Sequence, residues 1–289
     1  MDATPFVSVI IPAYHDWHRL ELCLRALKKQ TYPRDRFEVL VVNNDPDDYP
    51  PYEVAGRNIL LLEEEKPGSY AARNAGIRAS KGDVLAFTDS DCIPDEAWLN
   101  NGVQGLVSGA DRVAGHIQIF SANEKPKVSE AYELLFAFNQ KKYAENGFSA
   151  TANLMCFRYC FEKAGLFDPS LFSGGDIEWG YRATERGFSI SYQEAVTVSH
   201  PARGSMADLL KKHRRVAGGA QAFGRSNQKR QSLIRGLVPP IRKFKKISLS
   251  SEICLWHKIA LIPLSYFLKL FWTVSYQAAI RSWVKPTRQ

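Results

Sequence analysis

The chain has 289 residues, 45% of them hydrophobic, which is enough to bury a sizeable core as one globular domain with an appendage. Its N-terminus has no basic region ahead of a long apolar stretch, and its five cysteines are scattered, so we expect no secretory signal and no zinc site but reduced thiols in a cytoplasmic protein. The charge is uneven: 18 of the 38 Lys and Arg residues lie from Pro201 onward, together with only two of the 30 Asp and Glu residues.

The first 200 residues therefore have the composition of an ordinary acidic enzyme domain. The basic remainder is expected to bind an anionic partner. Nucleic acid is not the expected partner, because the basic part has no zinc-finger spacing and no RNA-binding signature. This part also contains the most apolar segment of the chain, which favours an anionic membrane surface.

Predicted strands alternate with predicted helices along the chain. The strands cover 7–12, 37–42, 59–62, 84–88, 111–120, 154–158 and 196–200, and the helices cover 19–30, 70–80, 128–143 and 176–186. This alternation predicts an α/β sheet layered with helices, with its functional loops along one edge.

The strand at 84–88 ends in Asp89-Ser90-Asp91. Ligands bind at the carboxyl ends of such strands, and two carboxylates at this spacing can hold Mg²⁺ or Mn²⁺ against a diphosphate. The alternative is an ordinary surface turn rich in Asp and Ser.

Four further segments accompany this acidic step. They are Pro12-Ala13-Tyr14, Asn43-Asn44-Asp45, the stretch from Pro67 through Gly68, Arg73 and Asn74 to Gly76, and the stretch from Gly174 through Asp176 to Arg182. In this order and at these separations, the motifs closely resemble those of the family 2 glycosyltransferases. The resemblance runs from about Phe6 to Phe223 and implies the GT-A fold: a Rossmann-like, nucleotide-sugar-binding mixed sheet flanked by helices.

The resemblance also implies transfer of a sugar from a nucleoside diphosphate donor with inversion at the anomeric carbon. Pro12, Ala13 and Tyr14 are then expected to flank the nucleobase, and Asn44 or Asp45 to hold base or ribose, although an Asx-turn would explain the same residues. Gly68 and Arg73 suit phosphate or ribose oxygens.

The same resemblance assigns the metal to Asp91, with Asp89 assisting or contacting ribose. His200 matches a position that can complete such a metal site, and the alternative is a histidine that is only hydrogen-bonded. The expected ion is Mn²⁺ or Mg²⁺, acting as a Lewis acid on the leaving diphosphate.

Asp176 is the expected catalytic base, because inverting transfer needs a carboxylate to take the proton of the acceptor hydroxyl. The family usually has Glu-Asp here, whereas this chain has Gly175-Asp176, and a helix N-cap is the structural alternative for Asp176. On the acceptor side we expect Glu178, Trp179 and Asn153. The open alternatives are an ion pair between Glu178 and Arg182 and a core position for Trp179.

Arg214 and Arg215 match basic residues that approach the donor diphosphate in the family, and a solvated basic helix face is the alternative. We therefore expect a catalytic domain over 1–224, with a donor half to about 120 and an acceptor half beyond it. A basic linker and amphipathic helices follow over 225–289.

The segment Trp256–Ile280 is strongly apolar and about 25 residues long, but contains Pro263 and Lys269. With the basic run Arg242–Lys246, it predicts peripheral association with the inner face of the cell membrane. The alternative is a pair of helices packed on the catalytic domain or on a second subunit.

The sequence thus predicts a metal-dependent inverting hexosyltransferase. Its donor is expected to be a UDP-sugar by the habit of the family, and its acceptor a lipid-linked or polysaccharide precursor. The alternative from another class is a catalytically silent, membrane-anchored nucleotide-sugar-binding subunit. A dehydrogenase is disfavoured, because the first strand is not followed by G-x-G-x-x-G.

Overall fold

The computed structural model describes residues 4–54, 56, 58–226 and 236–280. These residues form two compact units, one made of 1–118, 138–171 and 175–200, and the other of 119–137, 172–174 and 201–289. The sequence had suggested a boundary near residue 225. That position lies at the end of helix α8 (Met206–Ser226), inside the second unit.

The first unit is built on an eight-stranded sheet in the order β3-β2-β1-β4-β7-β6-β8-β5. The strands are β1 (Val7–Ala13), β2 (Phe37–Asn43), β3 (Ile59–Glu63), β4 (Val84–Thr88), β5 (Ile93–Pro94), β6 (Arg112–Phe120), β7 (Asn153–Phe157) and β8 (Ile190–Pro201). The first four lie parallel, and β7 runs antiparallel to β4 and β6. This is a mixed α/β sheet, as the alternation of elements predicted.

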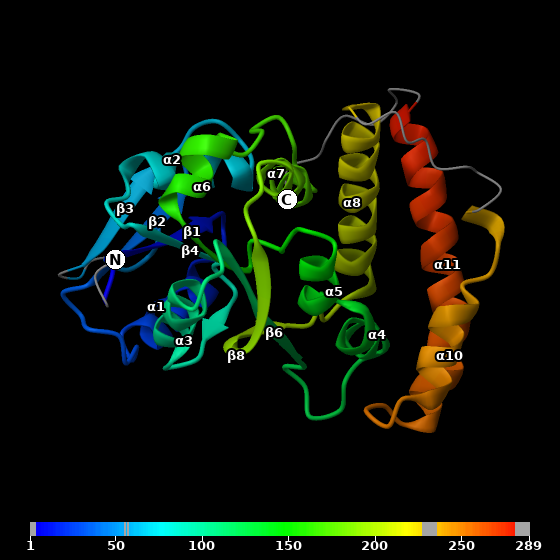
Figure 1. The fold of residues 1–289 in the computed structure, drawn as a ribbon. Coiled ribbons are helices and arrows are strands. Elements are labelled where there is room, and N and C mark those ends of the chain that lie inside the picture. The colour runs from blue at the N-terminus through cyan, green and yellow to red at the C-terminus, as the bar shows by residue number, and fades with distance from the viewer. Residues whose placement is uncertain (1–3, 55, 57, 227–235, 281–289) are drawn as a thin grey trace. The chain divides into compact units, whose positions relative to one another are not determined.

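Helices cover both faces of this sheet. They are α1 (Trp17–Leu27), α2 (Ser69–Ala79), α3 (Trp98–Val107), α5 (Gln140–Glu145), α6 (Arg158–Ala164) and α7 (Gly175–Glu185). In Figure 1, α2 and α6 lie on one face of the sheet and α1 and α3 on the other. Every residue of β4 is buried, which agrees with a strand covered on both faces.

Helix α2 lies unusually close to β1. A Cβ added at Gly76 would come within 2.6 Å of Ile10 Cγ2, so only glycine permits this approach. The approach fixes the N-terminal half of α2, which carries Tyr70 and Arg73, over the carboxyl ends of the strands.

The helix predicted over 128–143 is wrong in one respect, because the structure divides it in two. Helix α4 (Val128–Phe136) ends where Ala137 adopts an extended conformation, and Phe138 follows with a left-handed φ of 44°. The side chain of Asn139 then accepts a hydrogen bond from the backbone of Lys142 and begins α5. A helix-capping side chain in the middle of the apolar pattern is the physical reason for the break.

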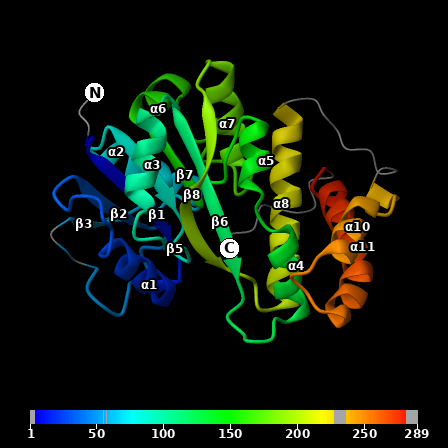
Figure 2. The same cartoon turned by 60° about the horizontal axis from the view of Figure 1, so that its bottom comes forward.

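The second unit is helical. Helix α10 (Ile241–Leu249) and helix α11 (Leu255–Ile280) pack with α4 and α8 around one apolar cluster, and the views in Figures 1 and 2 both show α10 beside α11. The cluster consists of Ala131, Tyr132, Leu135, Leu209, Ile247, Ile253, Leu261 and Leu268. The C-terminal helices therefore have a protein partner on one face, as the alternative to membrane association required. Pro263 lies inside α11 without ending it.

A buried carboxylate on α4, that of Glu133, also forms ion pairs with two cations of the second unit. Glu133, which is 2% exposed, accepts hydrogen bonds from Lys212 Nζ at 2.6 Å and from Arg203 Nη1 at 3.0 Å. Burial by itself would raise the pKa of Glu133, but Lys212 and Arg203 hold it at about 2. Burial lowers the pKa of Lys212 to about 8, against the attraction of Glu133. The two lowered pKa values are compatible. Two cations stabilise the ionised form of Glu133, whereas burial still disfavours the charged form of Lys212.

We expect Glu133→Gln to lower the free energy of unfolding by about 3 kcal/mol at pH 7, because it leaves two half-buried cations without their counter-ion. The folded pKa of Glu133 lies below its ordinary value of 4.5, so its contribution is present at neutral pH and is lost as the pH falls toward 2. Urea denaturation at pH 7 and at pH 3 measures this.

Glu21→Gln is the matched control, since Glu21 pairs with Arg25 on the exposed face of α1 and should change stability by less than about 0.5 kcal/mol. Equal effects of the two substitutions would show that the buried cluster adds no stability.

Candidate active site

The carboxyl ends of β1, β2 and β4 meet at one edge of the sheet, and β8 joins this edge through the two-residue strand β5. Ile93 of β5 pairs with Ser199 of β8, so the chain just after Asp91 lies beside His200. His200 Nε2 is 3.6 Å from Asp91 Oδ2. The structure therefore brings together two residues that the sequence assigned to a metal.

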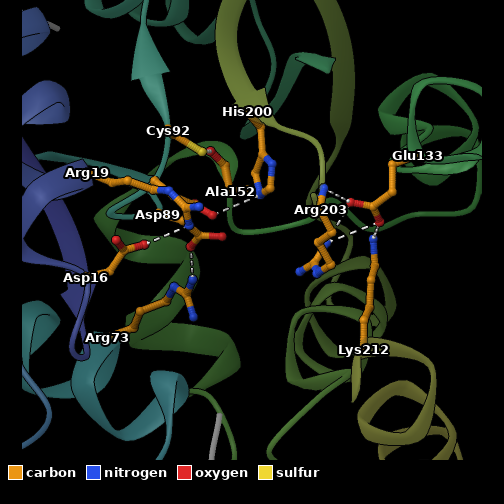
Figure 3. Close-up of polar contacts among 11 residues, drawn as sticks. Asp16, Arg19, Arg73, Asp89, Cys92, Glu133, Ala152, His200, Arg203 and Lys212 are labelled. Atoms are coloured by element: carbon orange, nitrogen blue, oxygen red, sulfur yellow. Dashed lines mark hydrogen bonds and ion pairs between the residues drawn. The ribbon is translucent and has the colours of Figure 1, made fainter. Parts of the chain in front are cut away.

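The ligand atoms of Asp91, Cys92 and His200 all lie within 4.8 Å of one another. Cys92 is a poor ligand here, because burial raises the pKa of its thiol and the thiol donates to the carbonyl of Ala152 (Figure 3). A carboxylate and an imidazole form the oxygen and nitrogen set that Mn²⁺ accepts readily and Mg²⁺ less so. The residues present thus fit such an ion, and Asp91 and His200 are the two that would hold it.

Asp89 is engaged by a cation from α2. Arg73, only 4% exposed, donates from Nη2 to Asp89 Oδ1, and Figure 3 shows its guanidinium directed at this carboxylate. Arg73 Nε is buried and has no hydrogen-bond partner among the described residues. A buried cation with one unused donor beside the acidic step suits an anionic ligand such as a diphosphate.

The turn after β2 is occupied by internal contacts. The buried Asn44 side chain donates to the carbonyls of Glu64 and Lys66, both at 2.8 Å, and accepts from the backbone amide of Gly68 at 2.7 Å. The amide of Asn44 thus holds a loop, and the Gly68 amide donates within the protein. Contact of Asn44 or Asp45 with base or ribose, and of Gly68 with phosphate, stays a prediction.

Tyr14 and His15 form an aromatic step after β1. Their ring centroids are 4.1 Å apart, and His15, which has a left-handed φ of 55°, contacts Asp45 Oδ2 through Nε2 at 2.7 Å. Asp45 thus acts on His15, a residue that the sequence analysis missed. The sequence signal for His15 was its position directly after Pro12-Ala13-Tyr14. Its positive φ, which few non-glycine residues adopt, is visible only in the structure.

Asp176 lies in the first turn of α7. Its Oδ1 accepts hydrogen bonds from the hydroxyl of Tyr70 and from the backbone of Ile177, both at 3.0 Å, and neither contact uses Oδ2. Burial raises the pKa of Asp176, while Tyr70 and the positive charge of Arg73 oppose that rise. A carboxylate with a raised pKa and a second oxygen outside these contacts is suited to accept a proton.

Of the three residues expected on the acceptor side, Trp179 and Asn153 are held inside the protein by contacts of their own. Trp179 is 1% exposed, stacks on Phe161 at 4.1 Å, and donates from Nε1 to the carbonyl of Gly165. Asn153 is fully buried, where its side chain bridges the carbonyls of His116 and Val196 and accepts from Trp98. Both lie in the interior and are not available to an acceptor, which corrects that expectation. Glu178 pairs with Arg182 at 2.8 Å, the alternative stated for it.

Arg214 and Arg215 lie on α8, in the second unit. Arg214 is exposed, and Arg215 donates to the carbonyl of Phe172 at 3.3 Å within the same unit. Their predicted contact with the donor diphosphate stays a prediction.

The sequence profile of the family described as "Glycosyl transferase family 2" matches residues 8–168. Glycosyltransferase AglE of Haloferax volcanii is 39% identical over 223 residues, covering 74% of this chain and 73% of that protein. A dolichyl N-acetyl-α-D-glucosaminyl phosphate glucuronosyltransferase of Methanococcus voltae, whose sugar is a 2,3-diacetamido derivative, is 21% identical over 224 residues. That match covers 71% of this chain and 70% of the relative.

Among solved structures, mannosyltransferase PcManGT from Pyrobaculum calidifontis, in complex with GDP-Man and Mn²⁺, superposes with a TM-score of 0.58 at 20% identity. The match covers 97% of this chain and 76% of that one. TarS 1–349 of S. aureus, in complex with UDP, gives 0.55 at 17% identity over 96% and 91% of the two chains. The chain therefore belongs to glycosyltransferase family 2 and is a transferase with the GT-A fold.

Proposed function

We propose that this glycosyltransferase is inverting and metal-dependent, and that it moves a sugar from a nucleoside diphosphate, with a UDP-sugar the first donor to test, to a hydroxyl of a lipid-linked or polysaccharide acceptor. The observation that carries the proposal is the pairing of Asp91 with His200 at the carboxyl edge of the sheet, in the same unit whose helix α7 carries Asp176. A protein that only bound the donor would have no use for a carboxylate arranged as a base.

The chain's own residues have separate tasks in this reaction. Arg73 and Asp89 would hold the donor side, where the buried Arg73 Nε has no hydrogen-bond partner among the described residues and suits an oxygen of the diphosphate. Asp176 takes the proton of the acceptor hydroxyl as that oxygen bonds to the anomeric carbon and the bond from this carbon to the diphosphate breaks. The ion held by Asp91 and His200 would supply Lewis-acid stabilisation of the leaving diphosphate.

A lipid-linked acceptor is the more specific form of the proposal. It rests on the activity for which the Methanococcus voltae relative is named, transfer to a dolichyl phosphate-linked sugar. The apolar C-terminal helix would suit an enzyme whose acceptor lies at a membrane, on its cytoplasmic face.

The test is donor binding and hydrolysis across UDP-, GDP- and dTDP-sugars, with Mn²⁺, with Mg²⁺ and with chelator. Metal-dependent thermal stabilisation by one nucleotide series, together with slow donor hydrolysis, supports the proposal. Binding without turnover, even with membrane lipids supplied as acceptors, supports the silent-subunit alternative. No metal-linked binding of any nucleotide would overturn both.

Membrane association also stays a proposal, and the structure changes how it would work. Leu255–Ala279 is long and apolar enough to span a membrane by length and composition, but one face of it is buried in the protein. Large apolar side chains are exposed on its other face, among them Trp256, Ile259 and Phe267. We therefore propose that α11 lies on the membrane by this face.

The basic run contributes fewer cations than the sequence suggested. Lys243 Nζ donates to the hydroxyl of Tyr132 at 2.6 Å and lies 4.9 Å from the centre of the Phe136 ring. Lys246 Nζ donates to the carbonyl of Leu135. Two of the four cations in Arg242–Lys246 are thus used inside the second unit, so apolar contact should carry more of the affinity than charge.

We expect the double substitution Ile259→Glu/Phe267→Glu to weaken binding to anionic vesicles at least tenfold, because each side chain would otherwise bury apolar area worth about 1.5–3 kcal/mol. Co-flotation with phosphatidylglycerol vesicles measures this. Leu60→Glu is the control, since Leu60 is a half-exposed apolar residue of β3 in the other unit. Equal flotation of wild type and double variant would contradict the proposal.

A further inference from the structure

Gly175 stands where the resembled family usually has the first acid of its Glu-Asp pair, and the structure shows what fills that place. A Cβ added at Gly175 would lie 2.7, 2.8 and 2.9 Å from three ring carbons of Tyr70. Real side chains do not approach so closely, so any residue other than glycine at position 175 would displace the Tyr70 ring.

The Tyr70 ring is held firmly in this place. Tyr70 is 5% exposed, its ring packs against Phe167 at 5.4 Å, and the guanidinium of Arg73 lies 5.6 Å from its centre. The same helix thus carries the phenol that reaches Asp176 and the cation that reaches Asp89. Since α2 is fixed against β1 at Gly76, the hydroxyl has little freedom to move away from Asp176 Oδ1.

We propose that Tyr70 is a positioning residue for the base, and that Gly175 is glycine in order to admit its ring. The inference rests on the proposed role of Asp176. The hydroxyl orients Oδ1 and leaves Oδ2 to receive the proton of the acceptor.

The chemical difference between a phenol and a second carboxylate is large. A neighbouring carboxylate would raise the pKa of Asp176 by repulsion, whereas a neutral hydroxyl donor favours the ionised form and lowers that pKa. Among the described residues, the titratable groups that act on Asp176 are Tyr70 and Arg73 of α2, while Tyr143 of α5 senses its charge. Tyr70 therefore counteracts the burial of Asp176, so that more of the base is ionised near neutral pH.

The first test is Tyr70→Phe, which keeps the ring and removes the hydroxyl. We expect the acidic limb of the pH profile of kcat/KM to move up by about one pH unit, because a hydrogen bond to a charged group is being lost. At pH values on the acidic side of the profile, the variant should transfer sugar about tenfold more slowly than wild type, and the difference should disappear as the pH rises. The KM for the donor should change less than twofold.

Tyr159→Phe is the matched control. The hydroxyl of Tyr159 donates to Asp111 at 2.6 Å, so this variant loses the same kind of hydrogen bond away from the site. It should lose stability without moving the acidic limb. A merely structural role for Tyr70 predicts that the two variants behave alike.

The second test is a double-mutant cycle. Gly175→Ala alone should lower transfer at least tenfold, because its Cβ displaces the ring that orients Asp176. In the Tyr70→Ala background the same alanine should cost less than twofold, since the ring is gone. Additive effects would show that Gly175 does not accommodate Tyr70. Thermal unfolding of each variant identifies any that fail to fold.

The third measurement needs no acceptor. Carbon-13 NMR of protein labelled at the Asp side-chain carboxyl, with the Asp176 resonance assigned by its loss in Asp176→Asn, follows the titration of this group directly. We expect its midpoint to rise by about one pH unit in Tyr70→Phe. An unchanged titration with an active wild type overturns the role of Tyr70 alone, whereas a shifted titration in a protein that transfers no sugar overturns the proposed function.

Discussion

Asp176→Asn should lower the rate of sugar transfer by about 10²–10⁴-fold, the range typical of losing a general base. Asparagine preserves the shape of the side chain and can still accept from Tyr70 and Ile177, so α7 should begin as it does now. It cannot take a proton from the acceptor hydroxyl. We therefore expect kcat to fall while metal-dependent donor binding is retained, as measured by single-turnover transfer and by thermal shift with nucleotide.

Asp35→Asn is the control for this substitution, because Asp35 is exposed in the loop before β2. It should leave both kcat and donor binding unchanged. Full activity of Asp176→Asn would remove Asp176 from the reaction. Inactivity of wild type and variant alike, with both binding donor, would favour the silent-subunit alternative.

Asp91→Ala should abolish Mn²⁺-dependent stabilisation by the donor nucleotide and lower transfer more than about 10²-fold, because the developing charge on the diphosphate loses a contribution of several kcal/mol. His200→Ala should weaken Mn²⁺ binding at least tenfold but leave the carboxylate in place. Electron paramagnetic resonance of added Mn²⁺ measures the affinity without requiring turnover.

Cys92→Ala tests whether the site binds a hard ion such as Mn²⁺ or a softer ion that needs a thiolate ligand. The Cys92 thiol lies within the same cluster of potential ligands, but burial raises its pKa, so it should remain a protonated donor to Ala152. We expect this variant to keep its Mn²⁺ affinity while losing some stability to the cavity. A large loss of metal affinity in Cys92→Ala would mean that a thiolate ligates, and that the ion is softer than Mn²⁺.

The order of strands and helices could be predicted from the sequence because it depends on local apolar patterns. The prediction failed in one place and left another undecided, where a cap or a tertiary contact outweighed the local signal. Helix α4 ends at Phe136, and Asn139 begins α5 inside what the sequence shows as a continuous apolar pattern. The basic run Arg242–Lys246 forms part of α10, because Ile247 is buried in the apolar cluster of the second unit and Lys243 and Lys246 bond to α4.

Residue types at the site could be predicted, but their partners could not. The sequence singled out Asp91, His200 and Asp176, whose positions follow strand and helix ends, and the structure places Asp91 beside His200. It could not show that Asn44 is used to hold a loop, because that depends on the backbone of Glu64, Lys66 and Gly68. Tyr70 was missed for the same reason: its importance comes from its contact with Asp176, a residue distant in the sequence.

The pairing of β5 with β8 has a consequence for how the enzyme is made. Asp91 and His200 are far apart in the sequence. They come together only after Ile93 has paired with Ser199, which closes a long loop of intervening chain. Pairings between such distant segments form more slowly than local contacts, because a long loop must close first. A nascent chain on the ribosome could therefore not hold the ion before β8 had emerged. Because the ion would recognise only the completed sheet, cells with ample manganese should protect the finished enzyme, but not its precursors, from proteolysis.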